Sequence, residues 1–154
     1  MLRDTISYTG VSDYIPSELN AFTQMNINEI LKLKRTLPSI DEILKVNVSH
    51  FITDKNVVKT ATGKSLEGQI LTGMKLISEG EFVVRIDYSS DEDFGGIHTF
   101  KEKIYFSNAT SLPETSSTNS RVVENVYVED IYANKLDQRE IIVNISFIFA
   151  IENF

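Results

Sequence analysis

Few side chains in this sequence could take part in acid–base or metal chemistry. The chain has two histidines, His50 and His98, and no cysteine. Carboxylates gather once, and these residues are Asp87, Asp91, Glu92 and Asp93. Carboxylate oxygens at close spacing could hold calcium. The spacing does not match an EF-hand loop, however, and a hairpin tip of solvated charge is the commoner use of such a run.

The remaining motifs for chemistry are weak. Neither histidine lies near a metal or acid–base motif, and His50 continues an apolar face, which predicts a buried, hydrogen-bonded imidazole. Residues 63–65 read Gly-Lys-Ser, but the first glycine of a phosphate loop is replaced by Val58 and no strand-to-helix context surrounds them. No serine stands in a Gly-x-Ser-x-Gly elbow. We therefore expect no enzyme activity, no cofactor and no metal.

Tyrosines are the other candidate binding residues. They could line a ligand groove, but more often such side chains pack on a sheet face with the hydroxyl at its rim. The four in question are Tyr88, Tyr105, Tyr127 and Tyr132.

Residues 139–151 predict the strand on which the fold is built. Apolar side chains occupy every second position from Ile141 to Ile151, and a strand sends alternate side chains to opposite faces. The run is β-branched and aromatic and has no glycine or proline, as is typical of a central strand.

Similar alternation predicts further strands along the chain. They cover residues 5–9, 24–34, 44–53, 57–60, 66–76, 82–88, 97–106 and 122–133. Turns are expected at 54–56, 63–64, 78–81 and 134–137, and loops at 89–96 and 108–120. About eight or nine strands joined by short turns predict an all-β fold, an antiparallel β-sandwich or barrel-like fold.

Three local features refine this prediction. Ser39 and Glu42 have the spacing of a capping box, so at most one short helical turn is expected, near 39–44. Glu102 falls on an apolar face, which indicates an edge strand or a bulge there. The apolar residues of 122–133 switch face near Asn125 and Val126, which indicates a β-bulge.

Length and charge limit the class of protein. A chain of 154 residues can bury the core of one domain. The formal net charge of −7 argues against nucleic acid or a membrane surface as the main partner, since both need a basic surface. No run has signal-peptide or membrane-helix character, so synthesis in the cytoplasm is expected.

The N-terminus predicts a separate arm, residues 1–21, ahead of a single β domain, residues 22–154. Ile6 and Tyr8 alternate with polar residues in a short strand that ends at Gly10. We expect this arm to be held by its own domain or by a neighbour. The interpretation we favour is that it adds to the exposed sheet edge of a neighbour, with Ile6, Tyr8 and Val11 as the self-assembly residues of a homo-oligomer.

From about residue 22 onward, the order of features resembles the SPOCS domain of SipL and related clostridial spore proteins. Leu37 to Ile40 with Ile43 and Leu44 resembles the family's proline-bearing lead-in to its first core strand. The other matching segments are 57–58, 63–68, 86–88, 98–100, 104–106, 126–130 and 139–143.

The resemblance implies a non-enzymatic structural role in the envelope or on the surface of a bacterial spore, with other spore-coat proteins as further partners. It carries no catalytic residues to transfer. Family members often have two or more such domains or a C-terminal LysM module, which this chain lacks, and this favours a building block that assembles into a layer or fibre. The alternative is a monomeric module that binds a glycan, calcium or a spore-coat partner protein through the tyrosines or the 89–96 loop.

Overall fold

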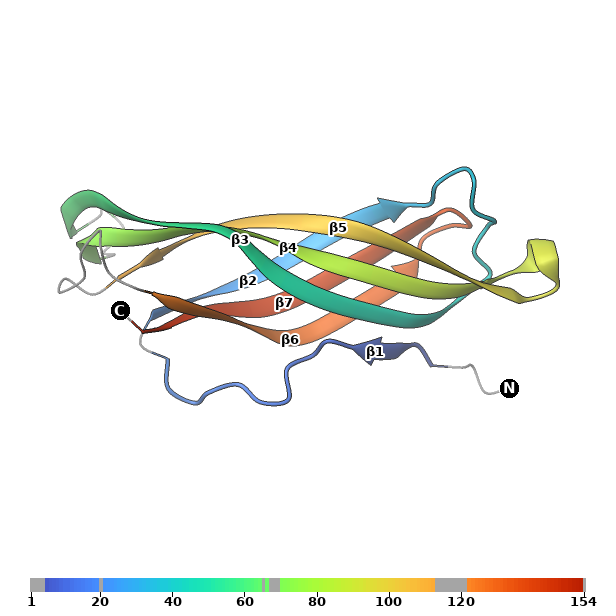
Figure 1. The fold of residues 1–154 in the computed structure, drawn as a ribbon, viewed down its shortest axis with the longest axis horizontal. Coiled ribbons are helices and arrows are strands. Elements are labelled where there is room, and N and C mark those ends of the chain that lie inside the picture. Colours follow the sequence, from blue (N-terminus) through green and yellow to red (C-terminus); the bar gives the residue numbers. More distant parts are fainter. Residues whose placement is uncertain (1–4, 20, 65, 67–69, 113–121, 154) are drawn as a thin grey trace.

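The computed structural model describes residues 5–19, 21–64, 66, 70–112 and 122–153. Its elements in chain order are β1 (Ser7–Thr9), β2 (Ala21–Lys32), β3 (Glu42–Lys64), β4 (Ile70–Ser90), the 3-10 turn η1 (Asp91–Asp93), β5 (Gly96–Ser111), β6 (Val123–Lys135) and β7 (Glu140–Asn153). One sheet has the strand order β1-β3-β4-β5 and the other β2-β7-β6. The all-β, sandwich-like fold predicted from the alternation is confirmed (Figure 1).

Strand β7 lies in the middle of its sheet, as predicted. It pairs antiparallel with β2 on one side and with β6 on the other. The six apolar residues of its inner row, Ile141, Val143, Ile145, Phe147, Phe149 and Ile151, are all 0–2% exposed. They pack against the inner row of β4, where the ring of Phe82 lies 4.8 Å from that of Phe147 between centroids. The core therefore joins both sheets into one unit.

The described chain has fewer strands than predicted because two of the expected turns are absent. Residues 54–56 lie inside β3 and residues 78–81 inside β4, and these two strands pair along most of their length. A register shift between Ile52 and Asp54 absorbs the local irregularity. Gly80 is needed for close packing, since an added Cβ would lie 2.4 Å from the Phe106 ring and 2.7 Å from the Phe51 carbonyl oxygen.

No helical turn forms near 39–44, where the sequence predicts at most one. The backbone there is held extended by partners far away in the sequence: the amide of Ile40 donates to Gln138 O and that of Asp41 to Ser89 O, both at 2.8 Å. Strand β3 begins directly afterwards at Glu42. The capping box fails because tertiary hydrogen bonds satisfy the amides that a helical turn would have used.

The predictions of an edge strand at Glu102 and of a bulge within residues 122–133 agree better with the structure. Strand β5 is the edge of its sheet, as Glu102 indicated. Strand β6 does contain bulges, but its register shifts lie at Val123–Glu124 and Val128–Asp130 rather than at Asn125–Val126. The buried row passes from Val126 and Val128 to Ile131 and Ala133, so the change of face falls at residues 129–130. The turn before β7 follows Lys135, as expected.

Several predictions fall partly outside the described residues. These include the start of the N-terminal arm, residues 1–4, the last residue of the Gly-Lys-Ser run, the start of the 66–76 strand and most of the 108–120 loop. In the described part of the chain, no helix is long and apolar enough to cross a membrane.

Candidate functional site

The N-terminal arm lies against two strand edges of its own domain. Strand β1 pairs in parallel with β3, with Ser7 opposite Lys45 and Thr9 opposite Asn47. The Asn47 side-chain amide also donates to the Thr9 hydroxyl at 2.6 Å. Because β1 is so short, it covers only the start of β3. Figure 1 shows the arm continuing along one side of the sandwich before the chain turns into β2.

The phenol of Tyr8 reaches from β1 across to β6 in the other sheet. Its hydroxyl donates to the carbonyl of Ala133 at 3.2 Å and accepts from the amide of the same residue at 3.1 Å. The ring is half-buried and packs against the core. Tyr8 therefore spans the gap between β3 of one sheet and β6 of the other, which we call the β3–β6 seam.

Ser12 forms the second contact with β6. Its backbone amide donates to the carbonyl of Val128 at 2.9 Å, and its hydroxyl accepts from the amide of Val128 at 2.9 Å. Tyr8 and Ser12 thus satisfy both main-chain groups of two residues on the open edge of β6. Such edge groups would otherwise be free to pair with another chain.

Gly10 allows the arm to approach the sheet this closely. Its φ is +113°, and an added Cβ would lie 2.2 Å from the carbonyl oxygen of Val48 on β3. Only glycine fits such a position without moving the backbone.

The structure places the predicted self-assembly residues unequally. Ile6 and Tyr8 are half-buried and pack against the core of their own domain. Val11 is 43% exposed. Sequence reasoning missed Gly10, which it assigned only to the end of a strand, and Ser12, to which it assigned no contact. A glycine directly after a short strand was the one available signal of close backbone contact.

Residues 13–19 connect the seam to β2 and are held less firmly. Among the described residues, they form no hydrogen bond. Tyr14 is 70% exposed and touches Tyr127 edge-on, with ring centroids 6.4 Å apart. A hollow of about 460 Å³ lies where this segment crosses the sheet, lined by Ile15, Pro16, Phe22, Ile148 and their neighbours.

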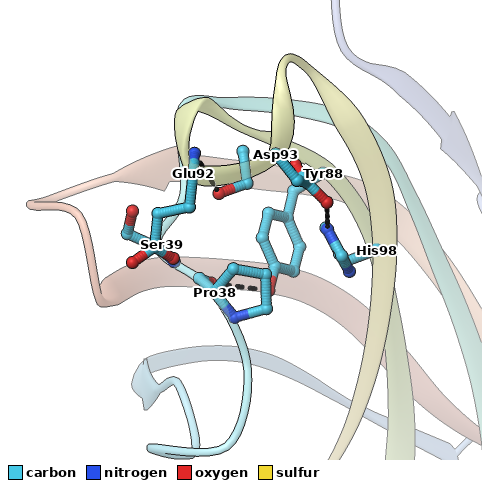
Figure 2. A network of polar contacts seen from close by, with 7 residues as sticks. Pro38, Ser39, Tyr88, Glu92, Asp93 and His98 are labelled. Atoms are coloured by element: carbon cyan, nitrogen blue, oxygen red, sulfur yellow. Dashed lines mark hydrogen bonds and ion pairs between the residues drawn. The ribbon is translucent and has the colours of Figure 1, made fainter.

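The acidic loop lies at the far end of the long β4–β5 hairpin and fastens two loops together (Figure 2). The Glu92 carboxylate accepts from the amide of Ser39 at 2.6 Å. The buried Tyr88 hydroxyl donates to the carbonyl of Pro38 at 2.8 Å, and burial raises the pKa of its phenol. In Figure 2 the Asp93 carboxylate points to the imidazole of His98 and pairs with it.

These contacts use Glu92 and Asp93, two of the four carboxylates that sequence reasoning offered to calcium, and Asp87 accepts from the Thr99 hydroxyl at 2.6 Å. Within the described ranges, no three histidine, aspartate or glutamate side chains form a group that could hold a metal ion. The prediction of a buried His50 is wrong: it continues the inward row of β3 beside Phe82 but is exposed. Desolvation still lowers its pKa below the ordinary value.

The outer face of the β2-β7-β6 sheet carries a row of amides. The Asn26 amide donates to Asn144 Oδ1 at 3.0 Å and to Ser146 Oγ at 2.6 Å, and the Asn144 amide donates to Asn26 Oδ1 at 2.8 Å and to Asn28 Oδ1 at 2.5 Å. Tyr132, 50% exposed, lies opposite Asn144 in the pairing of β6 and β7. This face is neutral and polar at its centre.

The comparisons with known proteins point to one family. A family model described as "SipL, SPOCS domain" matches residues 39–136. No curated protein and no solved structure matches the chain. The matched segment runs from the start of β3 to the turn after β6, so it includes both strands that hold the N-terminal arm.

Proposed function

Because this chain belongs to the SipL, SPOCS domain family, we propose that it is a non-enzymatic structural protein of the bacterial spore envelope. Family membership indicates a sporulation-related protein. In this proposal the protein is made in the cytoplasm and deposited in the envelope or on the surface of the spore. Its partners there are other copies of itself and other spore-coat proteins, assembled into a layer or fibre by the N-terminal arm.

The observation that carries the proposal is the kind of contact the arm makes. Tyr8 and Ser12 bind only main-chain groups of β6, and β1 pairs with the main chain of β3. Every copy of the chain presents the same edges. An arm that recognises backbone edges therefore carries what strand addition between copies requires.

The opposite edge of the sandwich supports the same assignment. Strand β5 places Lys101, Glu102 and Lys103 in succession along its exposed edge. Charged side chains on an edge strand discourage pairing with another chain. On β6, Glu129 and Asp130 lie between the two residues that the arm binds, Val128 and Ala133, whose own side chains are buried.

A non-enzymatic role is consistent with the few reactive groups available. The chain has no cysteine. His98 is paired with Asp93, and His50 has no polar partner among the described residues.

Deleting residues 2–20 tests the proposal. The shortened protein should remain folded by circular dichroism but stay monomeric, whereas the full chain should assemble in size-exclusion chromatography and electron microscopy. Ile6→Asp should have the same effect because Ile6 packs against the core, and Leu136→Asp, in an exposed turn, is the matched control. Assembly of the shortened protein to the same extent as the full chain would show that the arm is not the connector.

A second candidate function is favoured by the amide face of the β2-β7-β6 sheet. Asn28, Asn144 and Ser146 offer neutral donors and acceptors next to the exposed ring of Tyr132. Amides and an aromatic ring could bind the hydroxyls and the apolar face of a sugar. Calorimetric titration of the monomer with muropeptides, with Tyr132→Ala as the comparison, would detect such binding. No heat of binding from either protein would remove this candidate.

A further inference from the structure

We infer that the acceptor for the arm in an assembly is the β3–β6 seam of a second copy, so that copies exchange arms. This inference rests on the proposed function and specifies its contact. In the described part of the arm, the structure already shows how Tyr8, Gly10 and Ser12 bind the seam. The competing acceptor is the edge of β5 of a second copy, to which an arm would add and leave its own seam empty.

The seam has specific features that fit the arm. Gly10 passes within contact distance of the Val48 carbonyl at a backbone angle that only glycine adopts readily. On either side of Gly10, Tyr8 is hydrogen-bonded to Ala133 and Ser12 is hydrogen-bonded to Val128. These contacts fix the register of the arm as well as its direction, and nothing in the edge of β5 repeats them among the described residues. An arm that pairs elsewhere would leave them unused.

The connection between arm and domain permits exchange. Residues 13–20 span roughly 26–29 Å when extended, and residues 13–19 form no hydrogen bond with other described residues. Packed sheets are about 10 Å apart, so a segment of this length can cross from one domain to the edge of a neighbour. The hollow between this segment and Ile148 indicates that lifting it away breaks little packing.

Exchange also explains how one chain can exist both alone and assembled. The contacts are the same within a chain and between chains, so the balance depends on protein concentration. A dilute protein closes its own seam, and a concentrated one passes its arm to the next copy. If the arms pass head to tail, the copies form a fibre where the rotation between them does not close and a ring where it does.

The absence of cysteine makes a direct crosslinking test possible. Thr9 and Asn47 are opposite each other in the β1–β3 pairing and their side chains are hydrogen-bonded at 2.6 Å, which suits a disulfide. The double variant Thr9→Cys/Asn47→Cys, oxidised while dilute, should lock the arm onto its own domain. We expect it to remain monomeric and to recover assembly when a reductant is added.

The decisive sample mixes the two single variants, Thr9→Cys and Asn47→Cys, and is oxidised after assembly. Arm exchange predicts a covalent pair that contains one chain of each kind. Asp87 and Thr99 provide the matched control, since they are opposite each other in β4 and β5 and their side chains are bonded at 2.6 Å. The Asp87→Cys/Thr99→Cys double variant should form its disulfide and still assemble, and mixed single variants should give no covalent pair.

Each contrary outcome has a separate meaning. If the locked double variant assembles like the unlocked protein, arm exchange is wrong while assembly by another contact stands. If the chain assembles but the mixed variants give no covalent pair, the arm binds elsewhere, and β5 becomes the acceptor. If the unmodified chain never assembles at high concentration, both the exchange and the proposed function are wrong.

Discussion

Replacing Gly10 with alanine should release the N-terminal arm from the seam without unfolding the sandwich. The new Cβ would lie 2.2 Å from the carbonyl oxygen of Val48 and 3.1 Å from its carbonyl carbon, so one of the two backbones must move. The φ of +113° adds strain of about 1–3 kcal/mol for a residue with a side chain. Val48 belongs to the core, but the clash is with its backbone atoms only and is relieved when the arm leaves, so the melting temperature should change little.

The size of the effect follows from what the arm gains at the seam. Four hydrogen bonds join Tyr8 and Ser12 to β6. At about 0.5–1.5 kcal/mol each they contribute roughly 2–6 kcal/mol, and ordering the arm's backbone offsets part of this gain. The free-energy cost of the strain and close contact in Gly10→Ala is therefore of the same order as the free energy that holds the arm on the seam. A shift of only about 1.4 kcal/mol would already change the docked population tenfold.

Hydrogen exchange provides the assay, because the amide of Ser12 is protected only while it donates to Val128. In Gly10→Ala this amide should exchange about tenfold faster or more, and chymotrypsin should cut sooner at Tyr8 and Tyr14. Gly95→Ala is the control, since Gly95 also has a positive φ, +84°, but has nothing within 4 Å of an added Cβ. Unchanged protection of Ser12 in Gly10→Ala would refute the assigned role of the glycine.

Three further predictions follow from other contacts. Tyr8→Phe removes both hydrogen bonds to Ala133 and should weaken arm docking by about 1–3 kcal/mol, measured by the same exchange experiment. Phe147→Ala should lower the free energy of unfolding by about 3–5 kcal/mol in urea, since Phe147 is fully buried; a loss below 1 kcal/mol would contradict the core assignment. The hydrogen bond to Glu152 raises the pKa of Tyr127 from 10.0 to about 12, so its contribution to stability is complete below pH 10 and is lost as the pH rises past 12. Ultraviolet titration should show two tyrosines that ionise late, Tyr88 and Tyr127, and only one of them in Tyr127→Phe.

The sequence predicts the parts of this fold that depend on side-chain alternation. Strand β7 is placed correctly because its inner row from Ile141 to Ile151 faces only the core. Glu102 correctly marks the edge strand. Both signals are local, since a strand sends alternate residues to opposite faces whatever its partners are.

The errors arise where a local signal has more than one physical cause. Gly80 indicates a turn in the sequence, but in the fold it leaves room for the ring of Phe106. The capping residues Ser39 and Glu42 predict a helical turn, but the amides of Ile40 and Asp41 bond to remote carbonyls. Neither outcome can be read from neighbouring residues, because the partner lies on another strand.

In the candidate site, too, the sequence predicts the local strand pattern but not the contacts with remote residues. Alternation places Ile6 and Tyr8 on one face of a short strand, and both pack against the core of their own domain, while the role of Ile6, Tyr8 and Val11 in self-assembly stays a prediction. It could not show that the Tyr8 hydroxyl bonds to Ala133, or that Ser12 binds Val128, because these contacts join residues more than a hundred positions apart. Their positions depend on the β6 bulge at residues 129–130, which the sequence placed too early.

The mass in solution of the 154-residue chain tests the central claim most directly. Size-exclusion chromatography with light scattering should be run over a range of concentrations, up to those of a packed layer. The account predicts species heavier than the 17.4 kDa chain, whose share rises with concentration. A single species of 17.4 kDa at every concentration would contradict it.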